Sequence, residues 1–325
     1  RVRLGAWSRR ALLRCLATSY RADVPPPSHT RCNTCLVTVS PPDHNSHLSR
    51  RSLLIAGVVA TTWLSACNRT PSPPASAPTV AKLVANSPFY IAHRGGGRNW
   101  PEMTAYAYDQ AADLPYVKAI EISVCVTSDD VLVCSHDSNT IRMTGVNYEI
   151  AKTDWATLSG LMVSSAETDN PSQPAQPLTR FGDVINAHLS DLVCFVEPKT
   201  HITNKPLFDL MVSAGQPERI VWKQPVNSTL FTNAKAAGFS TWGYVLDELP
   251  HLSRLDEFAA DPSIDMLGVA VDQTPAVTER VLRAAADNHK PVIMWPVSTV
   301  AAREHALTSG ARGLLTADSL HVPAS

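Results

Sequence analysis

The sequence has almost no net charge of either sign. Its 28 Lys and Arg residues oppose 29 Asp and Glu residues, which gives a formal charge of −1 over 325 residues. A chain without a basic surplus offers no broad positive face to a nucleic-acid backbone, so no nucleic-acid partner is expected. Any anion must therefore be bound by a few local groups.

A long apolar run is also missing from the front of the chain. The run at 53–64, LLIAGVVATTWL, has 12 residues, whereas a membrane-spanning helix needs about 20. The cysteine pair Cys32 and Cys35 has C-x-x-C spacing but no second pair, which leaves a metal or redox site there without support. Residues 1–48 show no helical or strand period, and we expect upstream sequence without a fold or function.

Residues 49–67 resemble a bacterial export signal of the lipoprotein type. Arg50 and Arg51 precede the short apolar run, and Leu-Ser-Ala precedes Cys67, which the pattern predicts as the lipidated first residue. The pair of arginines also resembles a twin-arginine signal, and a short buried helix is the structural alternative. We expect an exported protein, periplasmic or lipid-anchored to the outer face of the bacterial cytoplasmic membrane, with a Pro/Ala/Ser-rich linker over 68–86.

Short apolar runs alternate with helix-like stretches from residue 87 to 322. Eight runs are read as strands: 89–92, 119–126, 192–197, 219–223, 241–246, 266–271, 291–295 and 313–317. The clearest helical stretches between them are 102–112, 206–215, 230–238 and 275–288. Eight such units predict an α/β fold, a (β/α)8 TIM barrel, with an open doubly wound sheet as the alternative. The run at 131–137 does not fit the alternation and predicts a β-hairpin excursion after strand two.

Polar and charged residues cluster at the predicted strand ends. In a parallel barrel these ends meet at one rim, where active sites lie. The residues concerned are His93, Arg94, Glu121, His136, Glu197, Lys199, Trp295 and Asp318. For any one of them the alternative is that a polar residue stands there only because the strand end is exposed to solvent.

The types of residue at this rim point to phosphoryl chemistry. Glu121 and Glu197 would repel each other in one pocket unless a cation lay between them, which suggests ligands of a hard divalent ion such as Ca²⁺ or Mg²⁺. Arg94 can fork onto phosphate oxygens beside the glycine run 95–97. Two histidines near neutral pKa can act as general acid and base. The expected reaction is metal-assisted hydrolysis of a phosphodiester.

The same residues carry a resemblance to the glycerophosphodiester phosphodiesterase family, from about Phe89 to Leu320. The matching blocks are HRGGGRNWPEMT, IEISVCVTSDDVLVCSHDSNTIRMTG, VEPK, MWPVS and GARGLLTAD. The resemblance implies a β/α barrel that hydrolyses glycerophosphodiesters to an alcohol and glycerol 3-phosphate with a divalent metal. It implies acid/base roles for His93 and His136, phosphate or substrate binding by Arg94 and Lys199, and metal binding by Glu121 and Glu197.

Three positions depart from the family pattern. Ser123 stands where the family has a metal-binding aspartate; it shares a face with Glu121, but a hydroxyl adds no negative charge. Met103 replaces an asparagine, and Pro296 replaces a threonine. We expect Ser123 to remain in a weakened metal site.

Two further residues have structural alternatives to a substrate-binding role. Glu102 is either a substrate or metal-site residue or a favourable first-turn glutamate of a helix. Trp295 either walls the glycerol pocket or belongs to the core.

Other interpretations stay open from the sequence. The first is a lipid-anchored binding protein with a degenerate metal site, for which Ser123 is the support; the second is a phospholipase D of the sphingomyelinase type. A cross-strand disulfide between Cys125 and Cys134 is also possible if the hairpin turns at 129–130. Cys194 is expected to be an inert buried thiol.

Overall fold

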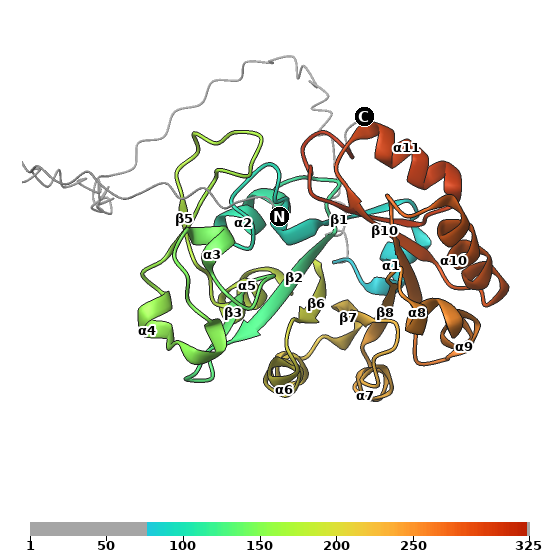
Figure 1. Ribbon diagram of the computed structural model, residues 1–325, viewed down its shortest axis with the longest axis horizontal. Coiled ribbons are helices and arrows are strands. Elements are labelled where there is room, and N and C mark those ends of the chain that lie inside the picture. Colours follow the sequence, from blue (N-terminus) through green and yellow to red (C-terminus); the bar gives the residue numbers. More distant parts are fainter. Residues whose placement is uncertain (1–76, 324–325) are drawn as a thin grey trace, which may run out of the picture. The chain divides into compact units, whose positions relative to one another are not determined.

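The computed structural model describes residues 77–323, and eight parallel strands in this part of the chain close into a barrel (Figure 1). The strand β1 pairs with both β2 and β11, so the sheet has no open edge on that side. The barrel strands are β1 (Phe89–Ala92), β2 (Ala119–Val126), β6 (Val193–Pro198), β7 (Ile220–Pro225), β8 (Ser240–Val245), β9 (Met266–Ala270), β10 (Val292–Val297) and β11 (Gly313–Thr316). The (β/α)8 prediction is confirmed, and closure excludes the open doubly wound sheet.

Helices surround the strands, and most of them bury apolar side chains against the outer face of the barrel (Figure 1). They are α1 (Val80–Ala85), α2 (Ala105–Ala112), α3 (Ile141–Thr144), α4 (Trp155–Leu158), α5 (Phe181–His188), α6 (Asn204–Ala214), α7 (Phe231–Ala236), α8 (Leu249–Ser253), α9 (Leu255–Ala260), α10 (Pro275–Asp287) and α11 (Val300–Ser309). The boundaries follow local chemistry. For α10, the Thr274 side chain accepts a hydrogen bond from the Val277 amide and Pro275 occupies the first turn. Within the described part of the chain, no helix has both the length and the apolar character to cross a bilayer.

The interior of the barrel is filled by alternate residues of its strands. Because strand side chains point to opposite faces in turn, one set enters the barrel and the other packs on the helices. The inward set forms one buried apolar cluster that includes Phe89, Ile91, Ala119, Val193, Phe195, Val221, Trp242, Met266, Ile293 and Leu315. Gly268 makes room for the Trp242 ring, since a Cβ there would lie 2.4 Å from the indole nitrogen. This alternation fixes which residues reach the rim.

The excursion after β2 is longer than a hairpin. The strand β3 (Leu132–Cys134) pairs antiparallel with β2, as predicted. The chain then forms α3 and α4, a small antiparallel pair of β4 (Met162–Val163) with β5 (Gln176–Pro177), and α5 before it returns to the barrel. The excursion contributes His136, Asp137 and Arg142 to the rim.

The possible disulfide between Cys125 and Cys134 is absent. The register pairs Cys125 with Val133 and Val124 with Cys134. Adjacent pairs in a ladder point to opposite faces, so the two thiols are directed apart. Both are free and buried, as is Cys194.

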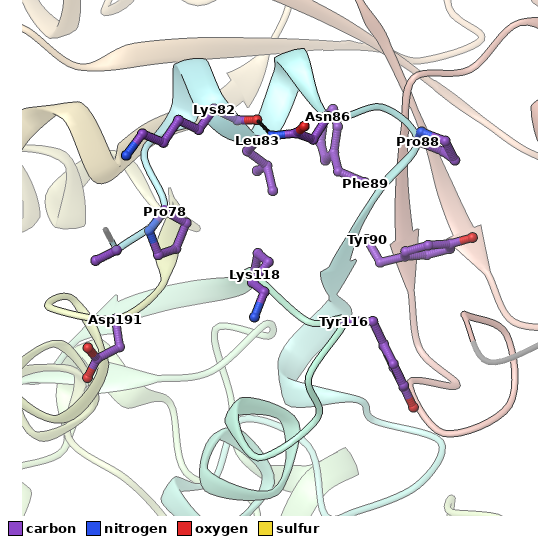
Figure 2. Close-up of a pocket in the computed structure, with 11 residues that line it drawn as sticks. Pro78, Lys82, Leu83, Asn86, Pro88, Phe89, Tyr90, Tyr116, Lys118 and Asp191 are labelled. Atoms are coloured by element: carbon purple, nitrogen blue, oxygen red, sulfur yellow. Dashed lines mark hydrogen bonds between the residues drawn. The ribbon is translucent and has the colours of Figure 1, made fainter. Parts of the chain in front are cut away.

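The helix α1 packs beneath the barrel at the amino ends of the strands and corrects the predicted linker boundary. Val80 and Leu83 are buried against the barrel interior, so the domain begins before residue 87, and only 68–76 of the predicted linker lie outside the described residues. Beside α1 is a cavity of ≈ 550 Å³ whose lining includes Lys82, Tyr116 and Lys118 (Figure 2). It lies at the opposite end of the barrel from the rim.

Candidate active site

Three of the predicted rim residues lie at the carboxyl end of the barrel because of the pleat of the strands. Each of the three follows an inward apolar residue by two positions, so it points the same way one step nearer the carboxyl end. His93 follows Ile91, Glu121 follows Ala119, and Glu197 follows Phe195. Ser123 and Lys199 each follow one of the two glutamates by two further residues. Ser123 lies against both glutamates, and Lys199 contacts Glu197.

The centre of the site holds a lysine that sequence reasoning missed. Lys223, in β7, places Nζ 2.7 Å from Glu121 Oε1 and 2.7 Å from Glu197 Oε2. Its position follows the same rule, two residues after the inward Val221. The sequence analysis included this lysine in the predicted strand 219–223 and assigned it no role. A cation does lie between the two glutamates, and it is this ammonium group.

Other donors complete the surroundings of both carboxylates. The Arg94 amide donates to Glu121 Oε2 at 3.1 Å. Tyr244 Oη and Lys199 Nζ donate to Glu197 Oε1 at 2.9 and 3.1 Å. Ser123 Oγ lies 3.2 Å from Glu121 Oε1 and 3.5 Å from Glu197 Oε2. All four carboxylate oxygens thus have a protein donor.

Burial and charge act in opposite directions on these groups. Burial raises the pKa of Glu121, but Lys223, His93 and Arg94 outweigh it and hold that pKa well below its usual range. Burial likewise raises the pKa of Glu197, and Lys223 and Lys199 bring it below its ordinary value. The pKa of Lys223 is lowered by burial but raised by more through the two carboxylates. The carboxylates are therefore ionised and the lysine is charged.

The residues present do not fit the divalent ion that the sequence predicted. Ca²⁺ takes six to eight oxygen ligands and Mg²⁺ about six, and both favour carboxylates. Here Ser123 replaces one carboxylate, and an ammonium lies between the two that remain. Within 77–323, no cluster of three His, Cys, Asp or Glu side chains could hold a metal. No chemical step is therefore derived through Ca²⁺ or Mg²⁺.

His136 is held as a neutral ring with a defined tautomer. Its Nδ1 lies 2.8 Å from Asp137 Oδ1, and its Nε2 lies 3.4 Å from Lys199 Nζ. An ammonium only donates, so Nε2 must accept and Nδ1 must carry the proton. Burial, Arg94 and Lys199 lower the pKa of His136, against the opposing effect of Asp137. The ring is therefore uncharged, and its Nε2 faces Lys199.

His93 lies in the same electrostatic environment. Burial lowers its pKa to about 3, with Arg94, Lys223 and His136 acting in the same direction and Glu121 opposing them. No hydrogen bond joins its ring to another group among residues 77–323. The ring is thus uncharged and has both nitrogens available for a ligand.

Arg94 combines an unusual backbone conformation with an unused donor. Its φ of 57° places it in the left-handed region, which is uncommon for a residue with a side chain and occurs at functional sites. Nη1 lies 3.1 Å from Glu102 Oε2. Nε is buried and makes no hydrogen bond. A phosphate oxygen would satisfy that donor.

Glu102 orients arginines, which explains its proximity to the site. One oxygen binds Arg94 and the other lies 2.6 Å from Arg142 Nη2. Arg142 in α3 also binds Asp137 Oδ2 at 2.6 Å and Glu167 at 3.1 Å. A hydrogen bond from His136 to Asp137 and a chain of ion pairs through Arg142 and Glu102 therefore join His136 to Arg94. Sequence reasoning missed Arg142, because its three partners come from separate segments.

Trp295 lies in a cluster of aromatic rings beside the charged centre. Its ring centroid is 5.6 Å from Tyr244 and 5.8 Å from Trp242, both in edge-to-face contact. Lys223 Nζ lies 5.4 Å from the Trp242 centroid, within the range of a cation–π contact. Trp295 is only partly buried, so part of its side chain packs in the aromatic cluster and part is open to solvent.

Comparison with known proteins gives one family. A model of the glycerophosphoryl diester phosphodiesterase family matches residues 93–294, which include every site residue described above except Trp295. The match therefore covers more than half of the chain. No protein in the curated sequence set matches significantly.

Solved structures with similar folds cover most of the described domain. A glycerophosphodiester phosphodiesterase from Agrobacterium tumefaciens has a TM-score of 0.59 at 16% identity, over 73% of this chain and 99% of that one. A glycerophosphoryl diester phosphodiesterase from Parabacteroides distasonis has a TM-score of 0.60 at 16% identity, over 77% and 92%. An Oleispira antarctica phosphodiesterase, solved with the product sn-glycerol-3-phosphate, has a TM-score of 0.59 at 19% identity, over 74% and 98%. Because these identities are low, the matches show a shared fold and no more.

Proposed function

Because the chain belongs to the glycerophosphoryl diester phosphodiesterase family, we propose that it hydrolyses glycerophosphodiesters to an alcohol and glycerol 3-phosphate. One observation carries this proposal most directly. The buried Nε of Arg94 has no hydrogen-bond partner, and the Arg94 charge lies close enough to His93 and His136 to lower the pKa of both rings. A phosphodiester would satisfy the arginine and lie between a proton acceptor and a proton donor. The product complex of the Oleispira antarctica protein is consistent with this ligand chemistry.

The proposed reaction has two balanced steps. The glycerol hydroxyl next to the phosphate attacks phosphorus and gives its proton to His136 Nε2, while the bond to the alcohol breaks and the alcohol oxygen takes a proton from His93. Water then attacks the cyclic phosphate with the proton transfers reversed, which yields glycerol 3-phosphate. The negative substrate raises the pKa of both rings, so that His93 can hold the proton it delivers.

The ion-pair chain supports these roles through position. Asp137 fixes the His136 tautomer, and Glu102 directs the Arg94 guanidinium. Arg142 binds both carboxylates, so the proton acceptor and the phosphate-binding group are held by one residue. Glu102 and Arg142 are therefore positioning residues in this proposal. Lys199 Nζ lies 3.4 Å from His136 Nε2 and adds positive charge beside it.

Incubation of the full chain with glycerophosphocholine tests the function. We expect glycerol 3-phosphate to accumulate, and we expect His93→Ala and His136→Ala each to lower turnover by about a hundredfold or more. His305→Ala, which removes an exposed ring on α11, serves as the matched control. Wild-type turnover in both site variants would remove the acid/base assignment.

The binding-protein interpretation remains the alternative, and the same assay decides it. Ser123 in place of an acid is the observation that favours it. Measurable binding of glycerophosphocholine without product, with or without added Ca²⁺ or Mg²⁺, would support the binder. Product formation under any of these conditions would exclude it.

Export and lipid anchoring at Cys67 form a separate proposal that depends on the sequence alone, because residue 67 lies outside the described residues. The short apolar run after Arg50 and Arg51 and the Leu-Ser-Ala-Cys site support it. Mass spectrometry of the native amino terminus should find a lipid-modified Cys67. An unmodified residue upstream of Cys67 at the mature terminus would contradict the proposal.

A further inference from the structure

Lys223 occupies the space between the two acidic side chains that a divalent ion would bridge. Its side chain is only 9% exposed, and its Nζ lies 2.7 Å from an oxygen of each carboxylate. The rings of Trp242 and Tyr244 cover it at 5.4 and 5.7 Å. An ammonium in this position cannot coexist with a metal that uses the same oxygens.

The charges at the centre are already balanced. Glu121 and Glu197 face two ammonium groups, Lys223 and Lys199. The cluster is formally neutral, whereas a dication would leave two positive charges in excess in a buried setting, which is strongly unfavourable. The serine at position 123 fits this charge balance, because an aspartate there would add a third carboxylate and leave one negative charge uncompensated. The change at 123 and the lysine at 223 are thus electrostatically complementary.

The coordination chemistry leads to the same conclusion. All four carboxylate oxygens accept a hydrogen bond or ion pair from the protein, and Ser123 Oγ lies against both groups. Metal entry would have to displace the Lys223 ammonium from both carboxylates. An ammonium has three N–H bonds, and two of them are directed at the glutamates. The third is left for an oxygen of a bound ligand.

We propose that Lys223 takes the place of the divalent ion and supplies the positive charge that stabilises the phosphoryl group, so that the enzyme acts without a divalent metal. This inference rests on the proposed function. Lys223 Nζ donates a hydrogen bond to a non-bridging phosphate oxygen, opposite Arg94, and forms no covalent bond. Preorganised charge of this kind is an effective source of transition-state stabilisation in a dry site.

Two measurements on the full-length wild type test the proposal. Turnover of glycerophosphocholine in excess EDTA should equal turnover with added Ca²⁺ or Mg²⁺ within about twofold, and titration calorimetry with either ion should show no binding tighter than about 1 mM, the weak limit of protein Ca²⁺ sites. Loss of more than about tenfold in EDTA, restored by either ion, would overturn the proposal. So would wild-type metal binding with a Kd below about 100 μM.

Variants provide a positive control for these measurements. The double change Ser123→Asp with Lys223→Ser restores three carboxylates and removes the ammonium, so it should bind Ca²⁺ at least about tenfold tighter than the wild type. Lys223→Arg retains the charge and should keep more activity than Lys223→Met, for which we expect a loss of about a hundredfold or more. Lys205→Met removes an exposed ammonium paired with Asp209 and is the matched control.

The two proposals fail in different ways. If the wild type cleaves no glycerophosphodiester under any condition, the proposed function fails, and calorimetry still decides the role of Lys223. Wild-type metal binding would then overturn the inference, and its absence together with Ca²⁺ binding by the double variant would support it. If Lys223→Met does not fold, the EDTA and calorimetry results on the wild type remain decisive.

Discussion

Replacing Lys223 by methionine should destabilise the protein strongly, and the structure gives the scale. The change keeps an unbranched side chain that is one atom shorter, and it removes the charge that separates Glu121 from Glu197, both of which are buried. Breaking a buried ion pair costs about 3–5 kcal/mol, because the remaining charge is left uncompensated. For a domain of this size each kcal/mol lowers Tm by about 2–4 °C, so we expect a loss of about 6–20 °C at pH 7.

The pH dependence of this loss provides a second signature. Glu121 has its pKa lowered in the folded state, so its contribution to stability is fully present above its unfolded pKa of about 4.3 and is lost as pH falls. In Lys223→Met the two carboxylates lack their ammonium, and protonation relieves their repulsion. The Tm gap between wild type and variant should therefore narrow as pH falls from 7 to about 4.

Thermal denaturation with and without Ca²⁺ completes the assay. Lys223→Met offers two uncompensated carboxylates, so millimolar Ca²⁺ should raise its Tm, as expected for a ligand that binds only the folded state. The wild type and Lys205→Met should show no Ca²⁺ effect. A loss of less than about 1 kcal/mol in Lys223→Met, unchanged between pH 7 and 4, would refute the electrostatic reasoning.

Three further predictions follow from the same structure. Arg142→Gln should lower kcat by about tenfold or more, because Asp137 and Glu102, which hold His136 and Arg94, lose the ion pairs with Arg142. The acidic limb of the pH–rate profile should move to higher pH, since Asp137 loses its cation, and an unchanged profile would contradict this. Gly96→Ala should lower stability by at least about 1 kcal/mol in urea denaturation, because φ is +89° and a Cβ would lie 2.8 Å from the Trp100 ring; unaltered stability would contradict the loop geometry. Burial raises the pKa of Cys125 to about 12, so mass-spectrometric mapping should find it unlabelled by thiol reagents until the protein unfolds, and rapid native labelling would contradict its burial.

The barrel could be predicted from the sequence because its signal is local and repeated. Each strand is a short apolar run with β-branched residues, and each observed strand begins and ends within about two residues of the predicted bounds. The helix α1 was missed because six residues after a Pro/Ala/Ser-rich stretch give little periodicity. Its burial depends on the barrel floor, which is formed by distant residues.

The site could be predicted only in part, because the sequence does not show which charged side chains pair with each other in the folded protein. His93, Glu121 and Glu197 stand out because they are polar residues at the ends of apolar runs. The two glutamates indicated a cation between them, which we expected to be a divalent metal. The cation in the structure is the ammonium group of Lys223, and the spacing of residues in the sequence does not show that it lies there. Arg142 could not be found, because its ion pairs with Asp137, Glu102 and Glu167 depend on how the excursion folds back over the rim.

The short helix at the foot of the barrel has a practical consequence for recombinant work. A truncation at residue 87, where the first strand is about to begin, would strip Val80 and Leu83 from beneath Phe89 and leave the amino-terminal opening of the barrel uncapped. Fragments of that kind would expose a ring of aliphatic and aromatic side chains to solvent, and they would aggregate readily. Shortened versions of the protein should therefore start upstream of Pro78.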